Sequence, residues 1–240
     1  MKKFYEKSEL WFAIVWIIVY CVVLGSIRGS QGDDSLGMLA GLLVITAGMV
    51  VFVKRYHLEE KYGLVKWKGK AGDYWFFIPM FILMTGNLWG GFAMSYSGIN
   101  QVFAVLSMLL VGFVEEMLFR GFLFRALLKK DPVPVAIAIS AVTFGIGHIV
   151  NLLTGQANME TVIQVFFAVA WGYILTMVFY KSGCLWICII VHGVVDALSK
   201  FAAHRGNAVY VYVIATIVVA VVYCVYLKGK PAALEDNDGY

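Results

Sequence analysis

Residues 114–120 read Val-Glu-Glu-Met-Leu-Phe-Arg and lie inside an apolar run that extends from Ile99 to Leu128. Three charged residues, Glu115, Glu116 and Arg120, interrupt this run. A charged side chain at the centre of a membrane helix costs at least ~2.5–3.5 kcal/mol on insertion scales. We therefore expect a membrane helix whose charges find partners on neighbouring helices, and a site that needs these charges.

The composition of the chain indicates an integral membrane protein. Hydrophobic residues make up 61% of the 240 residues and charged residues 14%, whereas soluble domains contain about 25% charged and about 45–50% apolar residues. Apolar runs cover nearly the whole length, so we expect residues 1–240 to form one transmembrane domain of the all-α class surrounded by lipid. The net charge of +4 comes from basic residues at the ends of these runs, which indicates membrane orientation and no nucleic-acid partner.

Eight segments approach the roughly 20 apolar residues that a membrane helix needs. They are residues 10–27, 36–53, 74–94, 99–128, 132–151, 161–180, 184–201 and 208–227. The first exceeds the ~7–15 apolar residues of a signal peptide, so we interpret it as a retained helix. Asp131 is expected to cap the fifth helix, which opens at Pro132. The polar segment 54–73 contains Tyr62 and Trp67 and is typical of a stretch lying on the cytoplasmic membrane surface.

Lysine and arginine residues indicate the orientation. Fifteen of the 19 fall in segments that face the cytoplasm if both termini lie inside, as the positive-inside rule requires. Arg28, Lys200 and Arg205 fall on the other side, and Arg120 lies within the membrane. This pattern predicts about eight spans in the cell membrane with both termini in the cytoplasm.

Small residues and cysteines in the apolar segments suggest helix packing. Gly37 and Gly41 are four residues apart, as are Gly86 and Gly90, and this spacing favours close helix contacts. All cysteines lie in apolar segments, so we interpret them as packing residues rather than disulfide partners. They are Cys21, Cys184, Cys188 and Cys224.

Two further polar sites lie inside apolar runs. His148 falls in the fifth expected helix, and His192 and Asp196 fall in the seventh. Counted from the cytoplasmic helix ends, Glu115 lies ~15 Å deep, His192 ~14 Å deep and His148 ~24 Å deep, at about 1.5 Å per residue. Three helices are thus expected to bring their polar residues to one buried site.

The spacing within the first site separates the two glutamates. Glu116 and Arg120 are four residues apart, which favours an ion pair. Glu115 is rotated by ~100° from them and suits a general base that activates water together with His148. The alternatives are that both glutamates only bridge helices and that His148 is a hydrogen-bonded core histidine.

His192 and Asp196 are also four residues apart on one helix face. Asp196 can hold His192 by a hydrogen bond and favour its charged form, and an imidazolium is a good donor to an oxyanion. The alternative is a buried pair that fixes the position of the helix.

The motifs E-E-x-x-x-R, F-x-x-x-H and H-x-x-x-D resemble, in order and spacing, those of the CPBP family of intramembrane proteases. This group includes CAAX-processing endopeptidases and bacteriocin-immunity proteins. The motifs fall within residues 112–200, and the family-like core covers about residues 74–228. They are carried here by Glu115, Glu116, Arg120, Phe144, His148, His192 and Asp196.

The resemblance implies an eight-helix membrane peptidase of prokaryotic type that hydrolyses a membrane-associated peptide or protein. Glu115 and His148 would activate water, and His192 and Asp196 would stabilise the oxyanion. Glu116 and Arg120 would shape the site, supported by Phe144.

Asp196 departs from the pattern of the prenyl-protein-processing members, which have asparagine at this position. An ionised aspartate cannot donate a hydrogen bond to an oxyanion, so Asp196 must be protonated or act by orienting His192. We therefore expect leader peptides, bacteriocin-like peptides or other membrane-associated peptides as substrates rather than prenylated proteins.

Metal use stays open at this point. Glu115, His148 and His192 could hold zinc with an open position for water, as in a metallopeptidase. The sequence has no H-E-x-x-H motif, and we favour a mechanism without a cofactor.

Two other functions fit the buried charges. A non-catalytic immunity or regulatory protein would bind a peptide without cleaving it, although every motif position is intact. A proton-coupled transporter would use Glu115 and the histidines as a relay, although no inverted repeat is evident.

Overall fold

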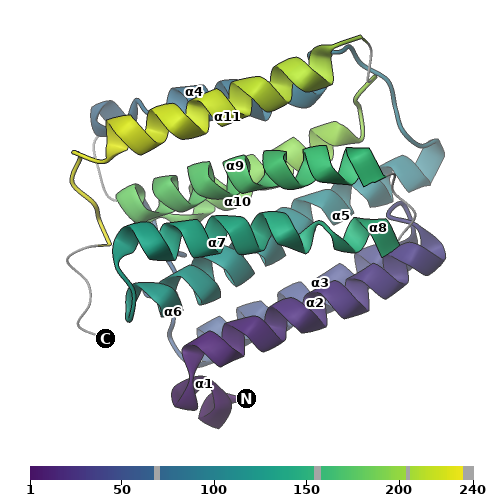
Figure 1. Cartoon of the computed structure of the whole chain (residues 1–240). Coiled ribbons are helices and arrows are strands. Elements are labelled where there is room, and N and C mark those ends of the chain that lie inside the picture. The colour runs from purple at the N-terminus through teal and green to yellow at the C-terminus, as the bar shows by residue number, and fades with distance from the viewer. Residues whose placement is uncertain (68–70, 154–157, 204–205, 235–240) are drawn as a thin grey trace.

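The computed structural model describes residues 1–67, 71–153, 158–203 and 206–234. Its long helices run roughly side by side (Figure 1). Within these residues the structure contains no strand, and its β feature is an isolated bridge between Phe92 and Ala202. The predicted all-α class is confirmed.

Five helical segments in the described part of the chain are long and apolar enough to cross a membrane. They are α2 (Glu9–Gln31), α3 (Leu36–Arg55), the continuous run of α5 (Gly98–Glu116), η3 (Met117–Phe124) and α6 (Arg125–Leu128), α9 (Asn158–Ser182) and α11 (Ala208–Leu227). Shorter elements accompany them: α1 (Lys2–Lys7), η1 (Ala71–Tyr74), α4 (Phe77–Met84), η2 (Gly86–Leu88), α7 (Val133–Gly147), α8 (Val150–Leu153) and α10 (Leu185–Ser199). The count of eight spans therefore stays a prediction.

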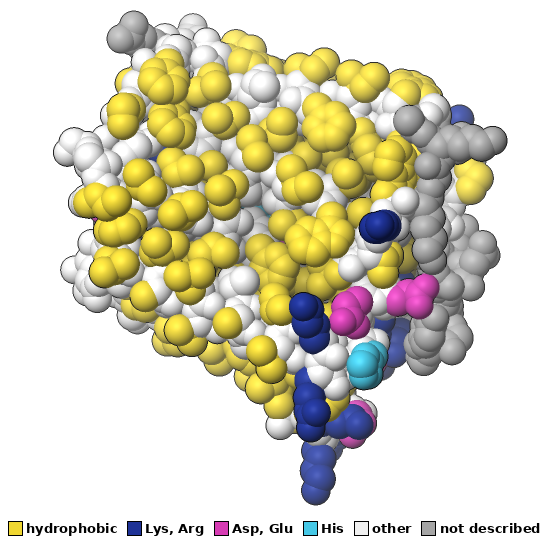
Figure 2. All heavy atoms as spheres, turned by 180° about the vertical axis from the view of Figure 1, so that it is seen from behind, with side chains coloured by type: hydrophobic (Ala, Val, Ile, Leu, Met, Phe, Trp, Pro, Cys, Tyr) yellow, Lys and Arg dark blue, Asp and Glu magenta, His cyan; other side chains and the backbone are white. Residues whose placement is uncertain are grey.

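The outer surface of the bundle is apolar, as a membrane protein requires. Val44 on α3 is 73% exposed, and Val225 on α11 is 75% exposed. Figure 2 shows apolar side chains across one whole face, with charged side chains gathered at one end. Since such a surface is unfavourable in water, these helices form a multi-pass membrane protein.

The expected third helix, residues 74–94, is wrong in its length. Helix α4 ends at Met84, and the chain leaves helical geometry after η2. Gly91 has φ +106°, a left-handed conformation that a side chain disfavours. The Ala93 N–H then donates to the carbonyl of Phe201 at 2.9 Å, so tertiary contacts hold this segment extended.

The fifth expected helix is also shorter than predicted. Helix α7 ends at Gly147, and a separate turn, α8, follows it. Pro132, not Asp131, occupies the cap position, without a side-chain hydrogen bond. Asp131 instead belongs to the preceding turn, where its N–H donates to the carbonyl of Leu127 at 2.9 Å.

The segment 54–73 does not lie wholly on the surface. Tyr62 is only 1% exposed, its ring packs 5.1 Å from that of Phe122, and its hydroxyl donates to Tyr5 Oη at 3.0 Å. Trp67 is partly exposed, as expected. Lys68 and Lys70, which also belong to this prediction, lie outside the described residues.

Contacts between helix ends define two ends of the bundle. Glu9 pairs with Lys61 at 2.6 Å and with Lys129 at 2.8 Å, joining the start of α2 to the loop after α3 and the turn after α6. We call this the basic end, because thirteen described lysines and arginines lie there. They are Lys2, Lys3, Lys7, Lys54, Arg55, Lys61, Lys66, Arg125, Lys129, Lys130, Lys181, Lys228 and Lys230.

Asp33 marks the opposite end, which we call the far end. Lys200, just after α10, pairs with Asp33 at 2.5 Å, and the Tyr96 hydroxyl also donates to Asp33. Burial by itself raises the pKa of the Asp33 carboxyl, but Lys200 and Tyr96 outweigh burial and hold that pKa below its usual range. The α2–α3 turn, the residues before α5 and the end of α10 are thereby fastened together.

Glycines let the central helices approach closely. A Cβ atom on Gly112 of α5 would lie 2.4 Å from the backbone nitrogen of Gly193 on α10. A Cβ atom on Gly172 of α9 would lie 3.0 Å from the carbonyl oxygen of Ala141 on α7. The predicted contact at Gly41 is present, since its Cβ position faces side chains of α2. The Gly112–Gly193 contact sets the position of His192 against Glu116.

Replacing Gly112 with alanine should therefore destabilise the protein. The added methyl group meets backbone rather than a movable side chain, and overpacking of this kind costs about 1–3 kcal/mol. We expect the midpoint of thermal unfolding in detergent to fall. Gly48→Ala is the control, because nothing lies within 4 Å of its Cβ position, and an equal loss in both variants would contradict the close contact.

Candidate active site

The central helix changes its winding directly after the paired glutamates. Helix α5 ends at Glu116 and continues as the π-helical segment η3, which is fully buried. One carbonyl of this segment, that of Phe119, accepts a hydrogen bond from Ser140 Oγ on α7 at 3.0 Å. Wide turns of this kind are frequent at functional sites, and this one lies between Glu116 and the end of the helix.

Glu116 connects the central helix to α10 through one oxygen atom. Its Oε1 accepts a hydrogen bond from Arg120 Nη1 at 2.8 Å and lies 2.7 Å from His192 Nδ1 on α10. Arg120 Nη2 donates in turn to the carbonyl of Gly172 on α9 at 3.2 Å. The side chains of Glu116 and Arg120 are both 0% exposed. The expected ion pair is thus present, and it also holds His192, a contact that helical spacing alone does not predict.

Three carboxylates surround the His192 imidazole. Its Nδ1 faces Glu116, while its Nε2 lies 3.3 Å from Asp196 Oδ2 and 3.6 Å from Glu115 Oε2. An ionised carboxylate only accepts hydrogen bonds, so an imidazole that serves both sides must donate from both nitrogens. This arrangement suits an imidazolium. The structure thus brings Glu115 and His192 together, as their similar depths in the sequence indicated, and Asp196 lies beside His192, as their four-residue spacing indicated.

Glu115 has a partner that the sequence analysis missed. The hydroxyl of Tyr20 on α2 donates to Glu115 Oε1 at 2.6 Å, and Tyr20 is only 9% exposed. The signal in the sequence was weak, since Tyr20 is one aromatic residue among several in an apolar helix. Tyr20 therefore holds one oxygen of Glu115, while the other, Oε2, faces His192 Nε2 at 3.6 Å, beyond hydrogen-bond distance.

His148 lies at the end of α7, further from the cluster. Its Nδ1 is 3.1 Å from the carbonyl of Phe144, and a carbonyl can only accept, so Nδ1 carries the proton. In the neutral form Nε2 then has a free lone pair. The described contacts of Glu115 run to Tyr20 and His192, so Glu115 and His148 share a cavity rather than a hydrogen bond.

Phe144 packs against three side chains of the site. Its ring packs edge-on against both imidazoles, with centroids 5.2 Å from His148 and 5.5 Å from His192. The Arg120 guanidinium carbon lies 4.4 Å from the same ring centroid. One aromatic ring therefore fixes the positions of two histidines and covers the buried cation.

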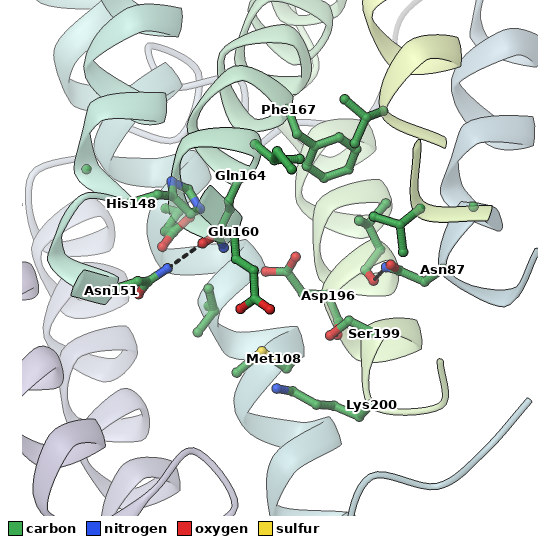
Figure 3. Close-up of a pocket in the computed structure, with 18 of the residues that line it drawn as sticks. Asn87, Met108, His148, Asn151, Glu160, Gln164, Phe167, Asp196, Ser199 and Lys200 are labelled. Carbon is green, nitrogen blue, oxygen red and sulfur yellow. Dashed lines mark hydrogen bonds between the residues drawn. The ribbon is translucent and has the colours of Figure 1, made fainter. Parts of the chain in front are cut away.

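The cluster faces a cavity of about 860 Å³. Tyr20, Glu115, His148 and Asp196 line it, and Asp196 is the most open of the three carboxylates, with 28% of its side chain exposed. Figure 3 shows His148, Asp196, Glu160 and Lys200 around the same space. The volume is sufficient for a short stretch of peptide.

The predicted zinc alternative has no assembled site in this structure. Among the residues that it describes, no three His, Cys, Asp or Glu side chains are grouped as metal ligands would be. We therefore assign no step of the reaction to a metal.

The fold and the site define a class: a helical multi-pass membrane protein with half-buried carboxylates and an imidazole at the wall of a cavity, backed by a buried glutamate and histidine. Residues 97–198 match the family described as Rce1-like, type II CAAX prenyl endopeptidase. The match confirms the resemblance to the CPBP family of intramembrane proteases, a group of hydrolases. It includes all seven motif residues, while Tyr20 lies outside it. A comparison with curated proteins gives no match.

Replacing Arg120 with leucine should destabilise the protein strongly. Glu116 would remain buried without its cationic partner on the same helix, and breaking a buried pair costs about 3–5 kcal/mol. Reversible unfolding in mixed detergent micelles measures this loss. The control is Lys129→Ala at the exposed pair with Glu9, which should change stability by less than about 1 kcal/mol. Similar losses in both variants would refute the central position of Arg120.

Proposed function

We propose that this protein is an intramembrane endopeptidase that hydrolyses a peptide bond of a membrane-associated peptide or protein. The observation that carries the proposal is the position of Glu115 beside His192 and Asp196 at the wall of the cavity. The match to a family of CAAX-type endopeptidases supports the same reaction class.

Glu115 acts as the general base. Water in the cavity donates a hydrogen bond to Glu115 and another to Nε2 of His148. Glu115 takes a proton as the water oxygen attacks the carbonyl carbon of the scissile bond. The Tyr20 hydroxyl occupies one oxygen of Glu115 and leaves the other for this proton.

His192 and Asp196 stabilise the tetrahedral intermediate. The imidazolium of His192 presents its Nε2–H on the side of Glu115 and Asp196, where the oxyanion develops. Asp196 orients His192 when ionised and itself donates to the oxyanion when protonated. Glu116 and Arg120 keep His192 in place, so that no rearrangement accompanies the build-up of charge.

Collapse of the intermediate completes the reaction. The C–N bond breaks, and the proton held by Glu115 passes to the departing nitrogen, which leaves as an amine. The other product carries a new carboxyl terminus that contains the water oxygen. Glu115 is then ionised again, and neither a metal nor a covalent intermediate is needed.

The substrates that we propose are leader peptides, bacteriocin-like peptides or other peptides held at the membrane. Members that process prenylated proteins have an asparagine amide at this position, which always donates a hydrogen bond, whereas Asp196 donates only when protonated. Because the site differs from theirs here, we extend the reaction class to this protein but not the recognition of prenylated substrates. Mass spectrometry of membrane and secreted peptides from cells with the wild-type or variant protein would identify the substrate.

Glu115→Gln should abolish cleavage while leaving the fold intact. The amide keeps the size of the side chain but cannot take a proton from water, and loss of a general base lowers rates by roughly 10²–10⁴. Single-turnover cleavage of the identified peptide in proteoliposomes measures the rate. Glu6→Gln, at a half-exposed glutamate of the basic end, is the matched control and should be fully active.

Full activity of Glu115→Gln would overturn the assignment of the base. If this variant instead kept a protective phenotype in cells without cleaving any peptide, the protein would act by binding. Ion flux that survives Glu115→Gln, without peptidase activity, would favour transport.

Tyr20→Phe should lower kcat by roughly ten- to a hundredfold with little change in KM. The substitution removes one hydrogen bond to a carboxylate, worth about 1.5–3 kcal/mol, without changing the shape of the cavity. The split between kcat and KM separates a positioning role from a loss of packing. Tyr210→Phe, at an exposed tyrosine of the same cavity, is the control. An equal effect on kcat in both variants would exclude a specific role for Tyr20.

A further inference from the structure

The cavity extends from the catalytic cluster toward one end of the bundle. Beyond Tyr20 and Glu115, its wall is formed by Arg28 near the end of α2, Glu160 near the start of α9 and Ser199 at the end of α10. All three belong to the far end, where Lys200 pairs with Asp33. The cavity wall away from the basic end is thus formed by far-end side chains, of which Figure 3 shows Glu160, Ser199 and Lys200.

The two ends differ strongly in charge. Thirteen of the described lysines and arginines lie at the basic end, whereas Arg28 and Lys200 are the described ones at the far end. Figure 2 shows the same asymmetry on one face, with the dark blue side chains gathered at one end. By the positive-inside rule, an excess of this size places the basic end in the cytoplasm. The far end then faces the other side of the membrane.

We infer that the cavity opens on the side of the membrane opposite the cytoplasm, and that its substrate is a peptide segment already translocated to that side. The first part rests on the position of the cavity and on the charges. The second part rests on the proposed function. The reaction that supplies the substrate is accordingly the transfer of a peptide across the membrane, and cleavage follows export.

The polar groups near the opening suit the backbone of an entering peptide. Arg28 Nη1 donates to Asn151 Oδ1 at 3.0 Å, and Asn151 Nδ2 donates to Gln164 Oε1 at 2.8 Å. Ser199 lies across the opening on α10, where its hydroxyl donates to the carbonyl of Asp196 at 2.6 Å. Amides and hydroxyls of this kind both donate and accept, as a row of peptide groups requires.

Cysteine labelling in intact cells tests the orientation without any substrate. Cys21 lines the cavity and is partly exposed, so it is a native reporter in a Cys224→Ala background. Ser199→Cys adds a reporter closer to the opening. Ser97→Cys marks the exposed far end, and Gly229→Cys marks the exposed basic end, where nothing lies within 4 Å of the Cβ position.

A charged maleimide that cannot cross membranes is added outside the cells. We expect Cys21, Ser199→Cys and Ser97→Cys to react before the membranes are permeabilised. Gly229→Cys should react about a hundredfold more slowly until permeabilisation, because a charged reagent crosses hydrocarbon poorly. Mass spectrometry of the intact protein measures each reaction.

The opposite pattern overturns the inference. In that pattern Cys21 and Ser199→Cys, like Gly229→Cys, react only after the membranes are permeabilised. Labelling of Ser97→Cys alone would equally overturn it, because the cavity would then have no opening to water on that side. These outcomes do not depend on catalysis, so a failure of the proposed function, seen as absent peptide cleavage, remains distinguishable.

Discussion

The structure depends on a single oxygen atom, Oε1 of Glu116, which receives Arg120 and faces His192 within a fully buried centre. Charges in such surroundings persist only when they are paired and hydrogen-bonded. With Arg120 and His192 as cations, the carboxylates of Glu115, Glu116 and Asp196 leave one negative charge in excess. Asp196 is the most exposed of the three carboxylates and lies at the wall of the cavity. The two nearby cations explain why carboxylates at this depth need not destabilise the bundle.

Much of this centre was predictable from the sequence, because a charged residue in an apolar helix must find a partner on its own helix or on a neighbouring one. The depths of Glu115 and His192 agreed, and the structure brings these side chains within 3.6 Å of each other. The spacing of Glu116 and Arg120 predicted their pair, and the apolar composition predicted the all-α membrane class. Helix α11 has the boundaries expected from its apolar run. These features follow from local spacing and from the energy of burying charge, which a sequence displays directly.

The features that were missed depend on contacts between distant segments. Tyr20 acquires its role only because α2 packs beside η3, which directly continues α5 after Glu116, and nothing within the α2 sequence shows that contact. The π-helical turn after Glu116 and the Gly112–Gly193 contact are likewise set by neighbouring helices. Residues 89–94 belong to an apolar run that predicts a helix, yet a hydrogen bond from Ala93 to Phe201, after α10, holds part of them extended. The contact of Glu116 with His192, in addition to its pair with Arg120, was also missed, because it joins two helices that are distant in the sequence.

The most direct test of the account follows the oxygen of the attacking water. Repeated turnover in H₂¹⁸O, with mass spectrometry of both the cleaved peptide and the protein, distinguishes a base from a nucleophile. If Glu115 activates water, ¹⁸O enters the new carboxyl terminus of the peptide and does not enter the Glu115 side chain. Incorporation of ¹⁸O into Glu115 would contradict the account, since it would mean that this carboxylate attacks the substrate itself.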